Sequence, residues 1–271
     1  MARLFDRKVK AIIIPENGIS VSVEGLRMSF QCEKTVEETP NTLRLEIYNM
    51  NKLNRSLLEA DKTRISLEAG YKDTSSLIFI GNIERVVHEK DGPDIISKLE
   101  CKDGGNRYRN ARIERSYGPG VRSNFVIADM AAEFGLRLGQ FVDIPATQYA
   151  QGLSVSGLIR DELTNVTRKS GLEWSVQDET LQIIPKGKST NDGIVLLNFE
   201  SGLINRPTKT KKGVNFTSLL QPELRPGKAV KIESDSQEID GMYKLKKVVH
   251  QGDSRQGLFQ SICEAKLLRR T

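Results

Sequence analysis

The feature of this sequence that most restricts its fold is an internal repeat. Five residues recur 162 positions later in the chain: Val86, Val87, His88, Asp91 and Cys101 return as Val248, Val249, His250, Asp253 and Cys263. A similar run precedes each copy, "ISLEAG" before the first and "VKIESD" before the second, with a shift of three residues that a change in loop length allows. The repeat predicts that one chain builds the same β unit twice.

The two repeated histidines are the only ones in the chain, so a split metal site or a catalytic dyad must be considered. In a repeated strand, however, His88 and His250 occupy corresponding positions of separate units and need not be near each other. A histidine base also needs an orienting group and a nucleophile within hydrogen-bond reach, which spacing alone does not establish. We expect a structural role, with each histidine bonded to the turn aspartate that follows it, Asp91 or Asp253.

Other motifs of catalysis or metal binding are incomplete. "PKGKST" resembles the tail of a phosphate-binding loop, but Gln182 stands where that motif needs a glycine. "GLSVSG" has Ser156 in place of the second glycine of a nucleophile elbow. The three cysteines are far apart and form no CxxC pair. We therefore predict that the protein is not an enzyme and has no catalytic, cofactor-binding or metal-binding residues.

Residues 1–111 have the period of β-strands. In "GLRMSFQCEKT" the apolar residues Leu26, Met28, Phe30 and Cys32 alternate with polar ones, and "TLRLEIYNM" repeats this pattern. "NKLNRSLLEA" has the spacing of a short helix between strands. The pattern predicts an antiparallel sheet, curled or closed.

Residues 112–190 change to a helical period. "SNFVIADMAAEFGL" predicts a helix with Ser123 as a candidate N-cap and Gly135 at its end. "SGLIRDELTNVTRKSG" predicts a second helix, with Ser156 as a possible cap and Gly171 as terminator. "LEWSVQ" and "LQIIP" then read as a hairpin.

The polar segment at 186–193 predicts a boundary, after which residues 191–271 return to strand-like runs. The predicted fold is mainly β with an α+β insert. Two similar antiparallel β-barrels, residues 1–111 and 191–271, flank a small α/β domain at 112–190.

The net charge is +6, and the basic excess lies in the last third of the chain. The candidate basic cluster is Lys209, Lys211 and Lys212, with Phe216 as the only aromatic residue nearby. Single-stranded nucleic acid needs aromatic side chains that stack on bases, so a solvated or partner-facing loop is favoured. We expect no specific nucleic acid, although a nucleic-acid-binding barrel stays an alternative. We also expect no membrane anchor, because no apolar run approaches about 20 residues.

Three stretches in order resemble one known family. "TPNTLRLEIYNMNK" with "RISLEAGYKDTSSLIFIGNIERV" is similar to the first barrel of bacteriophage tail baseplate hub proteins, and "GVNFTSLLQPELRPGKAVKIES" with "GMYKLKKVVHQGD" to the second. Between them, "GLSVSGLIRDELTNVTRKSGLEWSVQDETLQIIP" resembles the small insert of these proteins. The resemblance spans about residues 20–268, and the order of all three stretches carries it.

The resemblance implies a structural virion protein at the hub of a phage baseplate, most simply of a contractile tail. It implies a homotrimer whose six similar barrels join a sixfold tail tube to a threefold central spike. The implied partners are the tail tube or a tube-initiator protein, the spike, other baseplate proteins and a tape-measure protein in the lumen. The implied location is the virion tail, with host cytoplasm during assembly.

Exposed strand edges would serve such an assembly, because they can pair with a neighbouring chain. Two further alternatives remain open at this point. One is the hub of a related bacterial contractile injection system. The other is a peptidoglycan-active or peptidoglycan-binding protein, which only the small insert suggests.

Overall fold

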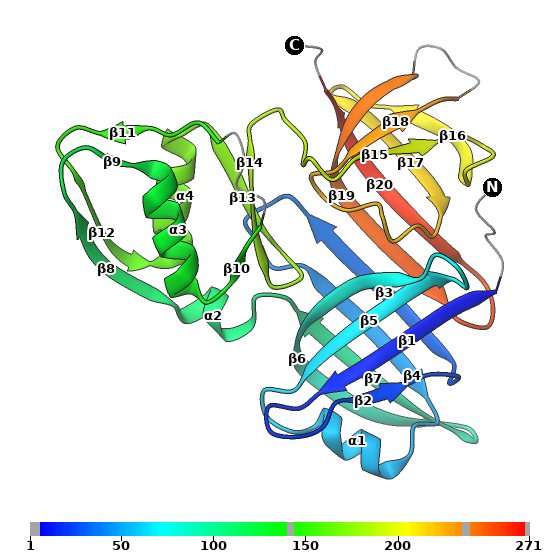
Figure 1. The fold of residues 1–271 in the computed structure, drawn as a ribbon. Helices are drawn as coiled ribbons and strands as arrows, with labels where there is room; N and C mark the ends of the chain where they lie inside the picture. The colour runs from blue at the N-terminus through cyan, green and yellow to red at the C-terminus, as the bar shows by residue number, and fades with distance from the viewer. Residues whose placement is uncertain (1–5, 140–143, 235–238, 269–271) are drawn as a thin grey trace.

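The computed structural model describes residues 6–139, 144–234 and 239–268. Figure 1 shows a small helix-containing insert to one side of two β units, and the long strands of the two β units lie side by side in one sheet. The predicted fold class, mainly β with an α+β insert, is confirmed, and the strands form large, chiefly antiparallel sheets. Among the residues that the structure describes, none of the helices has the length and hydrophobicity needed to cross a membrane.

The first β unit contains a short helix between long strands. Its elements are β1 (Arg7–Ile14), β2 (Val21–Val23), β3 (Met28–Thr35), β4 (Thr42–Tyr48), α1 (Lys52–Leu58), β5 (Arg64–Tyr71), β6 (Ser76–Asp91) and β7 (Asp94–Lys102). Alternate residues of β3 and β4 are buried, as the period-two pattern predicts. Helix α1 begins after Asn51, whose side chain accepts a hydrogen bond from the Asn54 amide, an N-cap contact.

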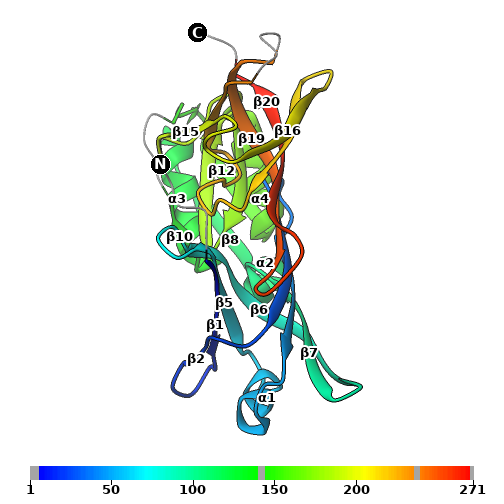
Figure 2. The same cartoon turned by 90° about the vertical axis from the view of Figure 1, so that its right-hand side faces the viewer.

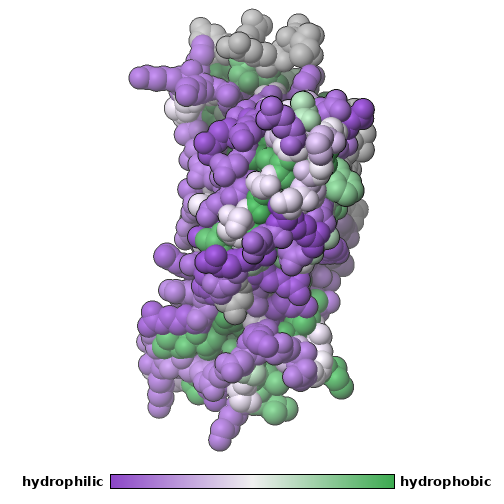
Figure 3. All heavy atoms as spheres, turned by 90° about the vertical axis from the view of Figure 1, so that its left-hand side faces the viewer, coloured by the Kyte–Doolittle hydropathy of each residue, from purple (hydrophilic) through white to green (hydrophobic). Residues whose placement is uncertain are grey.

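The insert consists of two main helices and short sheets. The short helix α2 (Gly105–Asn110) leads into it, and its elements are β8 (Arg112–Tyr117), β9 (Val121–Arg122), α3 (Ser123–Phe134), β10 (Arg137–Leu138), β11 (Gln148–Tyr149), β12 (Leu153–Leu158), α4 (Ile159–Lys169), β13 (Leu172–Gln177) and β14 (Thr180–Pro185). The predicted hairpin is the antiparallel pair of β13 and β14. The outward side of the insert is mainly hydrophilic (Figure 3).

The two predicted N-caps of the insert helices were wrong. Ser123 is the first residue of α3 rather than its cap, and its hydroxyl accepts a hydrogen bond from the Thr147 amide. Ser156 lies inside β12, opposite Glu114, three residues before α4 begins. In both places the chain enters the helix directly from a paired strand, so the preceding residue is fixed by the strand ladder. Gly135 ends α3 in the left-handed conformation, as predicted.

The second β unit follows the segment 186–193, which contains no strand or helix. Its elements are β15 (Ile194–Leu197), β16 (Leu203–Lys209), β17 (Gly213–Leu219), β18 (Ala229–Ile232), β19 (Gly241–Asp253) and β20 (Phe259–Leu267).

The two β units have the same strand order. Across the sheet the first unit reads β1-β5-β6-β7-β4-β3, and the second reads β15-β18-β19-β20-β17-β16. Each strand also holds the same rank along the chain as its counterpart, apart from the extra strand β2. One pairing differs in direction, because β1 is antiparallel to β5 whereas β15 is parallel to β18.

The long strands β6 and β19 share a local irregularity as well. The register of β6 against β7 shifts between Ile83 and Arg85, and that of β19 against β20 shifts between Leu245 and Lys247. The extra residues, Glu84 and Lys246, are again 162 positions apart. A β-bulge bends a strand and strengthens its twist, so both long strands curl at the same place.

The two units are joined edge to edge into one continuous sheet. Strand β3 of the first unit pairs antiparallel with β19 of the second, from Ser29 opposite Asp253 to Thr35 opposite Lys247. Within the described ranges, buried apolar side chains form one cluster for each β unit and one for the insert. The first cluster also includes Leu220 and Phe259 from the second unit, so the joint is packed as well as hydrogen-bonded.

Candidate functional site

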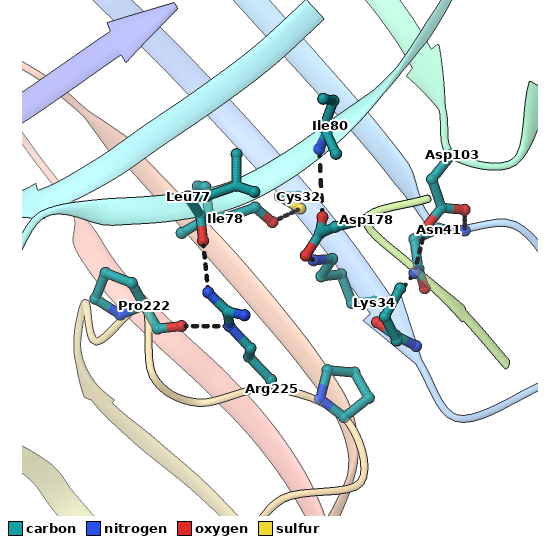
Figure 4. A network of polar contacts seen from close by, with 12 residues as sticks. Cys32, Lys34, Asn41, Leu77, Ile78, Ile80, Asp103, Asp178, Pro222 and Arg225 are labelled. Carbon is teal, nitrogen blue, oxygen red and sulfur yellow. Dashed lines mark hydrogen bonds and ion pairs between the residues drawn. The ribbon is translucent and has the colours of Figure 1, made fainter. Parts of the chain in front are cut away.

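The most concentrated polar chemistry lies where the insert meets both β units, and it begins at a turn. Asp178 and Glu179 connect β13 to β14 with φ angles of 52° and 62°. A two-residue hairpin turn of this kind requires positive φ at both residues, and an aspartate tolerates it better than most side chains. The turn carries Asp178 toward β3 and β6 of the first unit (Figure 4).

Asp178 meets a lysine buried in the first unit. The alternation that buries Met28, Phe30 and Cys32 also places Lys34 on the inner side of β3, where its side chain is 2% exposed. The Lys34 Nζ lies 2.6 Å from the Asp178 carboxylate, which also accepts a hydrogen bond from the Ile80 amide at 3.3 Å. A charge taken out of water needs such a partner. This ion pair therefore ties the insert to the first unit.

A second buried pair lies beside the first (Figure 4). The Asn41 backbone N–H and its side-chain amide donate to the Asp103 carboxylate at 2.8 and 2.7 Å. The same Asn41 amide donates to the Val176 carbonyl of the insert. The pKa of the Asp103 carboxyl is raised to about 7, chiefly by burial and to a smaller extent by the nearby Asp178, against the opposing effects of Lys34 and the Asn41 bonds.

The second β unit enters the same junction through a loop. Arg225 donates to the Leu77 carbonyl of β6 at 3.2 Å and to the Pro222 carbonyl in its own loop (Figure 4). Lys244 forms an ion pair with Glu173 of the insert. All three parts of the chain therefore meet through directed polar contacts, which fix their orientation more specifically than apolar packing alone.

The structure places the repeated histidines in corresponding strands and does not bring them together into a site. His88 Nδ1 lies 3.0 Å from the Ser97 hydroxyl on β7, and His250 Nδ1 lies 2.8 Å from the Ser261 hydroxyl on β20. The register pairs these residues directly in both units. Burial lowers the pKa of His250 to about 3, so this imidazole is neutral at physiological pH.

The expected histidine–aspartate bonds were wrong. Asp253 accepts instead from the Arg27 side chain at 2.9 Å and from the Arg255 amide at 2.8 Å, and Asp91 stands opposite Asp94 in the β6–β7 hairpin. Each histidine and its aspartate lie on one continuous strand. Because a strand rises about 3.3 Å per residue, three positions separate the side chains by about 10 Å and turn them to opposite faces.

The repeated cysteines occupy different places in the two ladders. Cys101 pairs with Ile83, whereas Cys263 pairs with Val248. Ser97 and Ser261, which face the two histidines, are 164 positions apart, whereas the histidines are 162 apart. The β19–β20 hairpin is therefore two residues longer than the β6–β7 hairpin. In the sheet, Cys263 therefore corresponds to Leu99, which pairs with Val86. Burial raises the thiol pKa of both cysteines, so neither is a reactive thiolate.

The remaining chemistry is sparse. Across the described residues, no cluster of three or more His, Cys, Asp or Glu side chains has the geometry to hold a metal ion. Phe216, the aromatic residue near the basic cluster, is 4% exposed and belongs to the core of the second unit, so it cannot stack on a base. Sequence reasoning missed the Lys34–Asp178 and Asn41–Asp103 pairs. A lysine in phase with the buried residues of β3 was a signal for the first.

Comparison with known proteins gives one family. The family described as "Baseplate hub gp41" matches residues 9–265. The chain belongs to the baseplate hub gp41 family. A sequence search against curated proteins gives no match. As a member of this family, the protein is a structural component of a phage tail baseplate, and the predicted resemblance to baseplate hub proteins is confirmed.

Solved structures of low sequence identity share the fold of this hub protein. The 43 kDa tail protein of prophage MuSo2 from Shewanella oneidensis matches 94% of the chain and 96% of its own, with a TM-score of 0.66 and 9% identity. A tail protein from Neisseria meningitidis MC58 matches 95% and 96%, with a TM-score of 0.64 and 10% identity. The E. coli c3393 protein, a component of a type VI secretion system, matches 89% and 73%, with a TM-score of 0.59 and 10% identity.

Proposed function

We propose that three copies of this hub protein form a ring that joins a sixfold tail tube to a threefold central spike. The observation that carries the proposal is the shared strand order of the two β units. Three chains with two such units each present six similar modules. One face of the ring can then match six tube subunits, while the differences between the two units preserve threefold symmetry for the spike.

The fixed joint between the units supports this role. An adaptor must hold its two modules at a constant angle, because a sixfold-like ring closes only when successive modules are related by nearly the same rotation. Here the β3–β19 ladder joins the two units directly, and the Lys34–Asp178 pair ties the insert to the first of them. Residues 1–111 and 191–271 would supply the modules, and the insert at 112–190 would brace them from one side.

The proposed partners follow from this placement. The tail tube or a tube-initiator protein would bind one face of the ring, the central spike the other, and further baseplate proteins the periphery. A tape-measure protein would pass through the lumen. The ring would assemble in the host cytoplasm and remain in the virion tail as a scaffold without catalytic activity.

Stoichiometry tests the proposal. Native mass spectrometry of the purified protein should give a species three times the 30.3 kDa chain, and quantification in purified tails should give three copies per particle. An obligate interface of this kind typically buries more than about 2,000 Å², so the trimer should persist on dilution. A protein that stays monomeric alone and is present in one or six copies per tail would contradict the proposal.

A further inference from the structure

Strand β19 receives two different partners along one of its edges. Its first residues, Gly241 to Lys244, pair with β18 of the same unit. Beyond the bulge, Lys247 to Asp253 pair with β3 of the first unit, while β20 lies along the other edge. The second half of β19 is thus the edge along which the other unit adds its strand β3, and we call it the acceptor edge.

The counterpart strand β6 has the same edge without that partner. Its first residues pair with β5, and its second half, Arg85 to Asp91, pairs with β7 on one edge. On the other edge of that second half, no strand is paired within the described residues. The exposure of neighbouring side chains follows this difference. Val248 is fully buried, whereas Val86 is partly exposed, and His250 is 1% exposed, whereas 21% of the His88 side chain is exposed.

The strand that would fill this edge is also present. Strand β16 is the counterpart of β3, and it ends the described sheet because it pairs only with β17. Its hairpin with β17 and the β6–β7 hairpin project at opposite ends of the molecule on the same side (Figure 2). Among the residues that the structure describes, two sheet edges at opposite ends of the molecule therefore lack a strand partner. One is the outer edge of β16, which we call the donor edge, and the other is the second half of β6, which corresponds to the acceptor edge of β19.

We propose that β16 of one copy pairs antiparallel with the second half of β6 in the next copy, repeating between chains the β3–β19 junction within each chain. The partner is a second copy of this chain, and the contact is head to tail. Such a heterologous contact closes into a ring when its rotation matches that of the internal junction. The number three rests on the proposed function above, whereas the choice of edges rests on the strand pairings.

The ladders predict the register of the new junction. In the first unit a row crosses the sheet from Gln31 through Arg44 to Glu100. In the second unit the matching row runs from Thr208 through Asn215 to Glu264. Thr208 is therefore the counterpart of Gln31.

On the acceptor strand, Gln31 pairs with Gln251, and Gln251 lies 162 positions after Glu89. The inference thus places Thr208 of one copy directly opposite Glu89 of the next. Pro207, next to Thr208, lacks an N–H group and can contribute only its carbonyl to the ladder. The new ladder is accordingly expected to be weaker than the β3–β19 ladder.

Disulfide trapping tests this register in the full chain. Residues directly opposite each other in an antiparallel pair have Cα atoms about 4.5–5.5 Å apart, which a disulfide can span. The double variant Thr208→Cys, Glu89→Cys should cross-link on mild oxidation into covalent species of up to three chain masses. The native cysteines are buried and should not react.

A matched control uses the internal junction. The double variant Gln31→Cys, Gln251→Cys should form the same disulfide within one chain and show no increase in mass. A mixture of Thr208→Cys protein with Glu89→Cys protein should cross-link to twice the chain mass and no further, because each chain then carries one reactive edge. Circular dichroism checks that each variant is folded.

The outcomes separate this inference from the proposed function. A trimer by native mass spectrometry that fails to cross-link at Thr208 and Glu89, while the internal control does, overturns the edge pairing and leaves the trimer intact. A folded protein that is monomeric and does not cross-link overturns both. Cross-linking of Thr208→Cys protein with itself would show a symmetric contact and would also overturn the inference.

Discussion

Substitution of Asp178 by Asn tests whether the buried ion pair holds the insert against the first β unit. Asparagine keeps the shape of the side chain and tolerates the positive φ of this turn, so the change removes the charge without straining the backbone. Its carbonyl can still accept the bond from the Ile80 amide. Lys34, with 2% of its side chain exposed, then loses the carboxylate that forms its ion pair.

The magnitude follows from the geometry. At 2.6 Å and an effective dielectric constant of about 20, the attraction between the two charges is about 6 kcal/mol. Part of this offsets the cost of burying both groups. Breaking a buried pair by removing one partner typically costs about 3–5 kcal/mol of unfolding free energy, and we expect Asp178→Asn to fall in that range. Replacing Lys34 by Met in the same chain should restore most of the loss, because no unpaired charge then remains.

Urea unfolding followed by circular dichroism measures these changes, and the double-mutant cycle isolates the pair. The exposed pair of Lys62 and Glu16 supplies the control, because Glu16→Gln should leave stability nearly unchanged. A loss below about 1 kcal/mol for Asp178→Asn would refute the reasoning. So would a double variant less stable than Asp178→Asn alone.

Three further predictions concern titration and close packing. The carboxyl of Asp103 has a folded-state pKa of about 7, above its ordinary value of 3.8, so the native state binds the proton more tightly than the unfolded state. Stability therefore falls as pH rises from about 4 to 7. Asp103→Asn should flatten that part of the pH–stability curve, and an unchanged slope would contradict the raised pKa. The imidazole of His250 has a folded-state pKa of about 3, below its ordinary 6.5, so stability is lost as pH falls from about 6.5 to 3. His250→Gln should reduce this loss in acid unfolding, and an equally steep loss in the variant would contradict the lowered pKa. A Cβ atom at Gly213 would lie 1.9 Å from the Ala265 carbonyl oxygen, so Gly213→Ala should push β17 away from β20 and cost about 1–3 kcal/mol of unfolding free energy, measured by thermal unfolding. Gly118→Ala is the control, because a Cβ atom there meets open space and stability should not change. Equal stability of the two variants would argue against this packing.

The sequence by itself determined the local structure and the duplication. Alternation along β3 and β4 depends only on neighbouring residues and the pleat of a strand, so it can be read without any tertiary information. The helical spacing of α3 and α4 is local in the same way, and Gly135 marks a helix end because few other residues adopt its backbone conformation. The recurrence of residues around His88 and His250 indicated two similar β units before any pairing was known.

Only the tertiary structure decided how distant segments meet. The β3–β19 ladder joins residues more than 200 positions apart, and nothing in either strand specifies its partner. The pairing of Lys34 with Asp178 depends on where the insert hairpin is directed, and the different places of Cys101 and Cys263 depend on a two-residue difference in hairpin length. Strand identity is a local property of the chain, whereas register and edge pairing are set by which surfaces can be buried together in three dimensions.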